Sequence, residues 1–503
     1  MIAEEFSKLS PAEVMITDAS CHFFFHVVPE TPPNSLIQRL TLTWAHDTLT
    51  ALKLICNLHA VRGTGKSDKE GFHTVARWLF KNHPRTLTYN VGPLANFGYF
   101  NDLPEIIYRL LEGPDVRRVQ KQEWEKRKWS SRLCSKSQMT EDRNKSRKLE
   151  SPAPSNGRPE EVWKLQREET IAKAEKVINR YNQDGDFRLL HEKVSEHFAQ
   201  YLKSDVEFLN SGELNEVGLA AKWCPSTDSS FDQSTLLCES IALLIFSREL
   251  RREVLVPLRK ALELPKVYMS PKNWGEIPFN RVPSVAMKLY VSKFFKHYNE
   301  RFRECLENVK LGKGKSQSGF SYPRDNPVVG RLDHRDGREV AELHWKRMVE
   351  NLLKAGKLEN CIAACDVYGS MRGTPMEVSV ALSILVAKNW NLSSDQIVKR
   401  IFVFSDMEFE EASMNPWETY YQVIRRKFEE AGCGDSIPQI VFWNLRDSQS
   451  TPVTATQDGV ALVSEFSENL VSMFLDNDGE INPEKIMLDA ISGEQYQKLV
   501  VVD

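Results

Sequence analysis

Apolar residues recur at helical spacing through the first part of the chain. Between residues 48 and 61 they return every three or four positions, which predicts an amphipathic helix, with Asp47 as its N-cap. A second predicted helix begins with Ser67 as N-cap and stops before Pro84, and a third starts at Asp102. Helices of this length joined by short turns are typical of α-solenoids, so we expect a HEAT-like helical region.

The pattern changes in the last third of the chain, where short continuous apolar runs alternate with helical segments. Runs of this kind are typical of buried parallel strands. The alternation predicts a doubly wound, Rossmann-like α/β domain. The four runs are 360–365, 401–404, 440–443 and 460–463.

These patterns divide the chain into five consecutive ranges. We predict a helical repeat region (1–115), a basic disordered insertion with linker (116–160), a continued helical region (161–310), a linker (311–338) and the α/β domain (339–503).

Composition indicates a cellular compartment for the protein but does not identify its partners. The net charge of −3 says nothing about partners, so any nucleic-acid signal must be local. Nine cysteines occur without a CxxC pair, which favours reduced thiols in the cytosol or nucleus. No apolar run reaches the roughly 20 residues of a membrane span, so we expect no membrane association.

One local charge run stands apart from this balance. Residues 117–148 hold twelve Lys or Arg against four Asp or Glu, with Trp124 and Trp129 among them. Cations can bind phosphates and tryptophans can stack on bases, which makes RNA a candidate partner. A solvated insertion without a ligand is the alternative. The candidate contacts are Arg117, Arg118, Lys121, Lys126, Arg127, Lys128 and Arg132.

A second candidate site lies at the carboxyl edge of the predicted sheet. Asp366 and Asp406 each end an apolar run, with the hydroxyls of Ser370 and Ser405 nearby in sequence. Ligands bind at that edge of such sheets, and these oxygens suit a hard cation such as Mg²⁺. The alternative is that each aspartate only caps its own loop or the following helix.

The residues around Asp366 resemble a known metal loop. The run Asp366-Val-Tyr-Gly-Ser370 is similar to the D-x-S-x-S loop of von Willebrand factor A (vWA) domains, and the strand ending in Asp406 resembles the one that supplies their later aspartate. This resemblance implies that Asp366, Ser370 and Asp406 would hold the cation. An acidic group from a protein partner would complete the coordination shell.

Longer strings resemble a family of uncharacterised proteins of plants, fungi and giant viruses, which joins a TROVE-like helical region to a vWA-like domain. Ro RNA-binding proteins share this architecture, and in them a helical ring binds RNA. The matching strings begin at Arg62 (RGTGKSDKE), Phe97 (FGYFNDL), Ala221 (AKWCPS) and Val340 (VAELHWKRM).

Two departures from the vWA pattern indicate a degenerate site. Tyr368 stands where the first serine ligand is expected, and a phenol is a poor ligand unless ionised. Only 40 residues separate Asp366 from Asp406. That interval fits one βαβ unit, so part of the central sheet and the threonine ligand are expected to be missing.

Two further motifs suggest other chemistry. The run Gly63-Thr-Gly-Lys-Ser67 is similar to the end of a phosphate-binding loop, but position 60 is alanine and no strand is predicted before it. Asp366 also stands where haloacid dehalogenase-like phosphatases have their nucleophile, but Tyr368 replaces their second aspartate.

The sequence therefore predicts a non-enzymatic binding or scaffold protein with RNA as a candidate ligand. A protein-binding scaffold without RNA and a phosphatase-like enzyme remain the alternatives.

Overall fold

The fold is seen in a computed structural model that describes most of residues 19–310 and, with more gaps, residues 358–503. The predicted linker at 311–338 lies outside the described residues. The longer stretches outside the description are 1–18, 142–158, 311–349, 351–357, 392–397, 408–419, 465–470 and 475–480.

The chain forms two compact units that are not consecutive stretches. Unit 1 contains residues 1–78, 96–98 and 262–502. Unit 2 contains residues 79–95 and 99–261 together with Asp503. The ranges predicted from sequence placed the first helices with the other helices, whereas the structure groups them with the α/β region.

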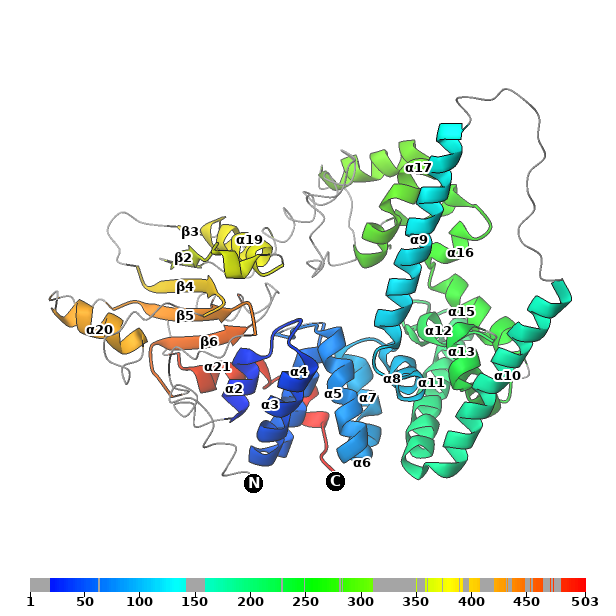
Figure 1. The fold of residues 1–503 in the computed structure, drawn as a ribbon, viewed down its shortest axis with the longest axis horizontal. Coiled ribbons are helices and arrows are strands. Elements are labelled where there is room, and N and C mark those ends of the chain that lie inside the picture. The colour runs from blue at the N-terminus through cyan, green and yellow to red at the C-terminus, as the bar shows by residue number, and fades with distance from the viewer. Residues whose placement is uncertain are drawn as a thin grey trace. The chain divides into compact units, whose positions relative to one another are not determined.

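Unit 1 is built on a four-stranded parallel sheet (Figure 1). Its strands are β2 (Cys361–Cys365), β4 (Arg400–Ser405), β5 (Gln439–Asn444) and β6 (Val460–Ser464). Each coincides with a predicted apolar run, and β6 is buried along its whole length. Two-residue strands β1 (Leu358–Glu359) and β3 (Trp390–Asn391) pair separately.

Strand order in this sheet follows chain order, β2-β4-β5-β6. A doubly wound sheet reverses its order at a switch point, and its ligand crevice opens there. The order of the four described strands does not reverse, so no switch point lies among them, and the doubly wound arrangement stays a prediction.

Helices from both ends of unit 1 complete the sheet. Helix α19 (Thr374–Lys388) lies against β2 and β4, and the Ser379 hydroxyl donates to the Phe404 carbonyl at 3.2 Å. Helix α20 (Tyr420–Glu430) adds Tyr421 to the core formed by β5 and β6. The C-terminal segment contributes α21 (Pro483–Ala490) and the 3₁₀ helix Glu494–Lys498.

The N-terminal helix α2 (Ala19–His26) also packs on this sheet, next to β6 (Figure 1). Phe25 is fully buried in one core with Phe442 and Leu462. The side-chain amide of Asn444, at the end of β5, donates to the Phe25 carbonyl at 3.1 Å. Apolar side chains of the sheet are thus covered by residues from the other end of the sequence.

Helices α3 (Pro33–His46), α4 (Thr48–His59) and α5 (Lys69–Asn82) follow, and the last two match predicted helices. Asp47 caps α4 by accepting from the backbone N–H groups of Leu49 and Thr50, which confirms its predicted role. The cap of α5 is displaced by one residue. Asp68 accepts from the Gly71 N–H at 3.1 Å, whereas the Ser67 hydroxyl donates to the Ala60 carbonyl.

A further part of unit 1 surrounds a separate aromatic cluster. It contains α16 (Pro265–Met269), the 3₁₀ helix Trp274–Glu276 and α17 (Ser284–Lys310). Phe279, Phe294 and Phe302 are buried at the centre of this cluster.

Unit 2 is helical in all its described elements (Figure 1). Long helices α9 (Val116–Glu141), α10 (Pro159–Gln183) and α11 (Gly185–Ser211) dominate it. No helix in the described part of the chain is long and apolar enough to cross a membrane. The shorter elements are α6 (Pro84–Tyr89), α7 (Val91–Phe97, partly in unit 1), α8 (Asp102–Glu112), α12 (Ala220–Trp223), α13 (Ser230–Thr235), α14 (Leu237–Ile245), the π-helix Arg251–Leu255 and α15 (Val256–Ala261).

Candidate functional sites

The loop that follows β2 brings Asp366 next to the end of β4. The register pairs Cys365 with Phe404, so the next residues of the two strands emerge at the same edge. The hydroxyl of Ser405 donates to one carboxylate oxygen of Asp366 at 2.7 Å. The backbone N–H of Tyr368 donates to the other at 2.9 Å. Asp366 thereby ties the ends of two adjacent strands together.

The other predicted ligands lie close by in the fold. Asp406 follows Ser405 directly and is buried. Its neighbour Met407 is buried with a φ of 63°, so the chain turns sharply after β4. Ser370 is half-buried in the 3₁₀ helix Gly369–Met371. The prediction that both aspartates reach one edge of the sheet is therefore met.

Tyr368 contributes its backbone rather than its side chain. The side chain is 74% exposed, while the N–H of the same residue binds Asp366. In the described part of the chain, no group of three or more His, Cys, Asp or Glu side chains is arranged to hold a metal ion. The observed hydrogen bonds stabilise the loop, and both oxygens of Asp366 already accept one bond.

The basic run forms a helix where an irregular insertion was predicted. Helix α9 covers Val116–Glu141, and its residues are mainly Lys, Arg, Glu, Gln and Ser with no internal Gly or Pro. Lys, Arg, Glu and Gln have favourable helix propensities. A run rich in these charged residues can therefore form a helix. Residues 142–148 of the run lie outside the described residues.

Arg117, one of the predicted nucleic-acid contacts, packs within unit 2. Its guanidinium binds both carboxylate oxygens of the buried Glu105 and lies over the rings of Tyr108 and Phe231. Glu105 also accepts from Arg109 at 2.8 Å. Burial raises the pKa of Glu105, but the hydrogen bonds from Arg117 and Arg109 outweigh burial and hold that pKa below its ordinary value.

The other candidates on α9 are more exposed. Arg118 pairs with Asp115 at 3.0 Å and Arg127 with Glu123 at 3.7 Å, both at the surface. Lys121 and Lys126 are exposed. Trp124 and Trp129 are exposed by 59% and 67%. Lys128 and Arg132 lie in the helix, but their side chains lie outside the described residues.

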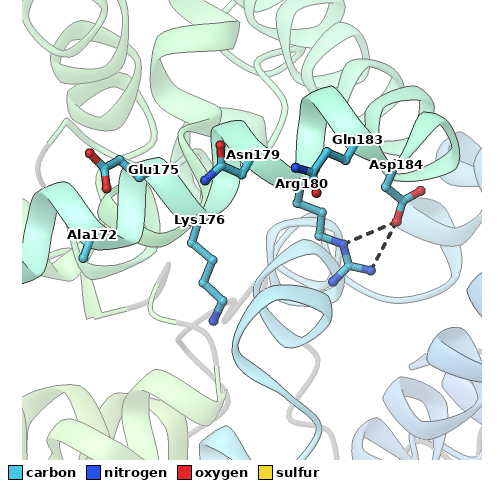
Figure 2. A pocket seen from close by; sticks show the side chains of 7 residues that line it. All are labelled: Ala172, Glu175, Lys176, Asn179, Arg180, Gln183 and Asp184. Atoms are coloured by element: carbon cyan, nitrogen blue, oxygen red, sulfur yellow. Dashed lines mark hydrogen bonds and ion pairs between the residues drawn. The ribbon is translucent and has the colours of Figure 1, made fainter.

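A shallow groove of about 530 Å³ runs along α10 (Figure 2). Lys176 pairs with Glu112 at 3.3 Å, and Arg180 pairs with Asp184 at 3.4 Å. Arg180 also donates to the Leu110 carbonyl. Sequence reasoning did not find this groove, because its charges are balanced and their spacing is that of any solvated helix. The lining residues are Ala172, Glu175, Lys176, Asn179, Arg180, Gln183 and Asp184.

The lysine of the Gly-Thr-Gly-Lys-Ser motif is used inside the protein. Lys66 is buried, and its ammonium donates to the carbonyls of Phe24 and Val27 and to the hydroxyl of Ser464. An ammonium with three protein acceptors has no free donor for a nucleotide phosphate. The motif therefore joins α2 to the sheet.

The sequence matches two families at different positions. The family described as "Domain of unknown function (DUF2828)" covers residues 7–358, well over half of the chain. The chain belongs to this family. The family described as "Domain of unknown function (DUF7788)" matches residues 386–499.

The chain is also similar to a viral protein. The uncharacterized protein L728 of Acanthamoeba polyphaga mimivirus is 25% identical over 370 residues, which cover 58% of this chain and 64% of the relative. The chain thus spans less than two thirds of that relative's length. No solved structure matches the chain.

Proposed function

We propose that this protein is a non-enzymatic RNA-binding protein and that the exposed part of α9 contacts the RNA. The observation that carries this proposal is the exposure of Trp124 and Trp129, each by more than half, on a helix that also exposes Lys121, Lys126 and Arg127. Tryptophan has a large apolar ring that a folded protein usually buries. On a cationic surface, such a ring can stack on an unpaired base while the cations bind phosphates.

The arrangement of the cations supports single-stranded RNA as the ligand class. Lys121 and Trp124 are three residues apart on α9 and share one side of the helix, as residues at this spacing do. Lys126 and Arg127 lie within three residues of both tryptophans. A base can therefore stack while a neighbouring phosphate is neutralised. Paired bases in a duplex offer no free ring face for this contact.

The rest of the proposal rests on the resemblance to Ro proteins. We interpret the helices of unit 2 as HEAT-like and TROVE-like, and the sheet of unit 1 as a vWA-like fold with a degenerate cation site. In this proposal Asp366, Ser370 and Asp406 are the remnant of a Mg²⁺ site that an acidic partner would complete. The protein would act in the cytosol or nucleus, and a scaffold that binds only proteins is the competing function.

Crosslinking of the purified full chain to oligouridine that carries 4-thiouridine tests the proposal. Replacing Lys121, Lys126 and Arg127 by Gln should lower the crosslinked fraction by about tenfold at limiting protein, and Trp124→Ala with Trp129→Ala should lower it similarly. The matched control replaces Arg425, Arg426 and Lys427 by Gln, which removes the same charge from the exposed side of α20. Equal crosslinking by the α9 variants and the control would refute the proposal.

A further inference from the structure

Helix α14 of unit 2 is apolar on nearly all sides. Its sequence from Leu237 to Ile245 is Leu-Cys-Glu-Ser-Ile-Ala-Leu-Leu-Ile. Leu237, Cys238 and Ile241 are buried, and the helix packs against α11. A helix that is apolar all round normally lies inside a protein. Exposed apolar residues on α14 are therefore unusual.

Three large apolar side chains at the C-terminal end of α14 are nevertheless exposed. Leu243 is 76% exposed, Leu244 is 37% exposed and Phe246 is 92% exposed. We call these three residues the α14 patch. Single exposed apolar residues are common, but grouped ones at the end of an apolar helix indicate an interaction surface.

Phe246 is also held in a conformation that its residue type disfavours. It has a φ of 57° and a ψ of 32° at the C-terminus of α14. Its N–H donates to the Leu243 carbonyl and the Ser247 N–H to the Ala242 carbonyl, the bonds of a Schellman motif. Glycine is the usual residue there, because a Cβ atom strains the left-handed backbone. The phenylalanine ring gains no burial in return.

A cation borders the patch. The ammonium of Lys203, on α11, lies 5.8 Å from the centre of the Phe246 ring. Lys203 is exposed and forms no ion pair with any residue that the structure describes. The surface therefore places the positive charge of Lys203 beside exposed apolar side chains.

We propose that the α14 patch and Lys203 together bind a segment of another protein that presents apolar side chains beside an Asp or Glu. The apolar side chains would cover Leu243 and Phe246, and the carboxylate would pair with Lys203. Burial of the Phe246 ring by the bound segment would then offset the backbone strain at Phe246. No burial of that ring offsets the strain in the free chain. This site is separate from α9 and does not depend on RNA binding.

Charge and shape disfavour the other occupants. A symmetric contact between two copies would bring two Lys203 side chains of like charge to one shared apolar patch. A nucleic acid would meet two leucines, which offer no ring for stacking, and a single cation. An acidic, apolar protein segment matches both features.

Selection of a random peptide display library on the immobilised full chain tests this inference. The enriched peptides should carry two or more apolar residues with an Asp or Glu, and Lys203→Glu should shift the enrichment to Lys or Arg. Phe246→Gly should weaken the binding of a selected peptide by about tenfold or more while raising the melting temperature, because glycine relieves the strain. Leu289→Ser, which removes an exposed leucine from α17, should change neither peptide binding nor enrichment.

Several outcomes would overturn the inference. These are enrichment of no peptide, peptides whose binding does not depend on Phe246, or peptides whose charge is unchanged by Lys203→Glu. Light scattering that shows a dimer lost in Phe246→Gly would assign the patch to a second copy instead. Loss of oligouridine binding in Phe246→Gly would assign it to RNA. A lowered melting temperature in Phe246→Gly would give the residue a purely structural role.

Discussion

The ammonium of Lys66 donates a hydrogen bond of 2.7 Å to the hydroxyl of Ser464, which lies 398 residues further along the chain. The Ser464 hydroxyl in turn donates to the Phe24 carbonyl at 2.7 Å. Lys66 and Ser464 therefore share the carbonyls at the end of α2. This cluster attaches the N-terminal helices to the last strand of the sheet.

Replacing Lys66 should weaken unit 1 as a whole. Lys66→Met keeps the length of the side chain but leaves the carbonyl of Val27 and its neighbours short of a donor in a buried place. We expect a loss of about 3 kcal/mol in the free energy of unfolding, measured by urea denaturation. Lys69→Met, at an exposed position on α5, is the control and should change stability little. Equal stabilities for the two variants would contradict the structural role of Lys66.

Arg117 should matter for folding and not for RNA. Arg117→Ala leaves the buried Glu105 with only part of its hydrogen bonding, so the helical unit should lose about 2 kcal/mol of stability. Arg118→Ala, whose ion pair with Asp115 lies at the surface, should cost less than about 0.5 kcal/mol. Thermal unfolding followed by circular dichroism would separate the two. A stable Arg117→Ala variant with weakened RNA binding would reverse this assignment.

The apolar pattern predicted the strands well and the tertiary partners poorly. Runs such as 440–443 and 460–463 specify strands because both of their faces are buried. The covering of Phe442 and Leu462 by Phe25 depends on packing between distant segments, which periodicity does not record.

The candidate sites show the same division between local and tertiary information. The convergence of Asp366 and Ser405 was predictable, because parallel strands in register end at one edge. The packing of Arg117 could not be predicted, because a count of charges does not show that Glu105, on another helix, is buried beside it. The sequence likewise showed Lys66 only as part of a motif similar to a phosphate-binding loop. Its structural role depends on the end of α2 and on Ser464, which are distant in sequence.

Acid should destabilise unit 1 through His22. Burial, with the nearby charge of Arg39, lowers the pKa of His22 from 6.5 to about 4. Below pH 6.5 His22 is protonated in the unfolded chain, whereas in the folded chain it stays neutral down to about pH 4. The free energy of unfolding therefore falls as the pH drops from 6.5 to about 4. His22→Gln should remove that part of the slope in urea unfolding between pH 7 and pH 4.

The contribution of His22 is separable from those of the carboxylates. Glu105 has a lowered pKa, so its stabilisation is present above its unfolded pKa and is lost only as the pH falls through its folded value. That loss occurs in both wild type and His22→Gln and cancels in their difference. A difference that stays constant from pH 7 to pH 4 would show that His22 is not held neutral.

The Asp366 loop should be insensitive to magnesium. Both oxygens of Asp366 accept hydrogen bonds from within the protein, and the Tyr368 side chain is exposed. We expect the melting temperature of the full chain to be the same in excess Mg²⁺ and in EDTA. Ser405→Ala should lower it in both, because the tie between β2 and β4 is lost. A rise with Mg²⁺ that Asp366→Asn abolishes would show a functional cation site.

Affinity for oligouridine as a function of salt, measured by fluorescence anisotropy on the full chain, tests the proposed RNA contact most directly. If α9 binds phosphates, the logarithm of the association constant falls linearly with the logarithm of salt concentration. The variant lacking Lys121, Lys126 and Arg127 should then bind more weakly, with a slope shallower by about 2. The α20 control should keep the wild-type slope. Binding that is absent, independent of salt, or equal in slope for both variants would contradict the proposal.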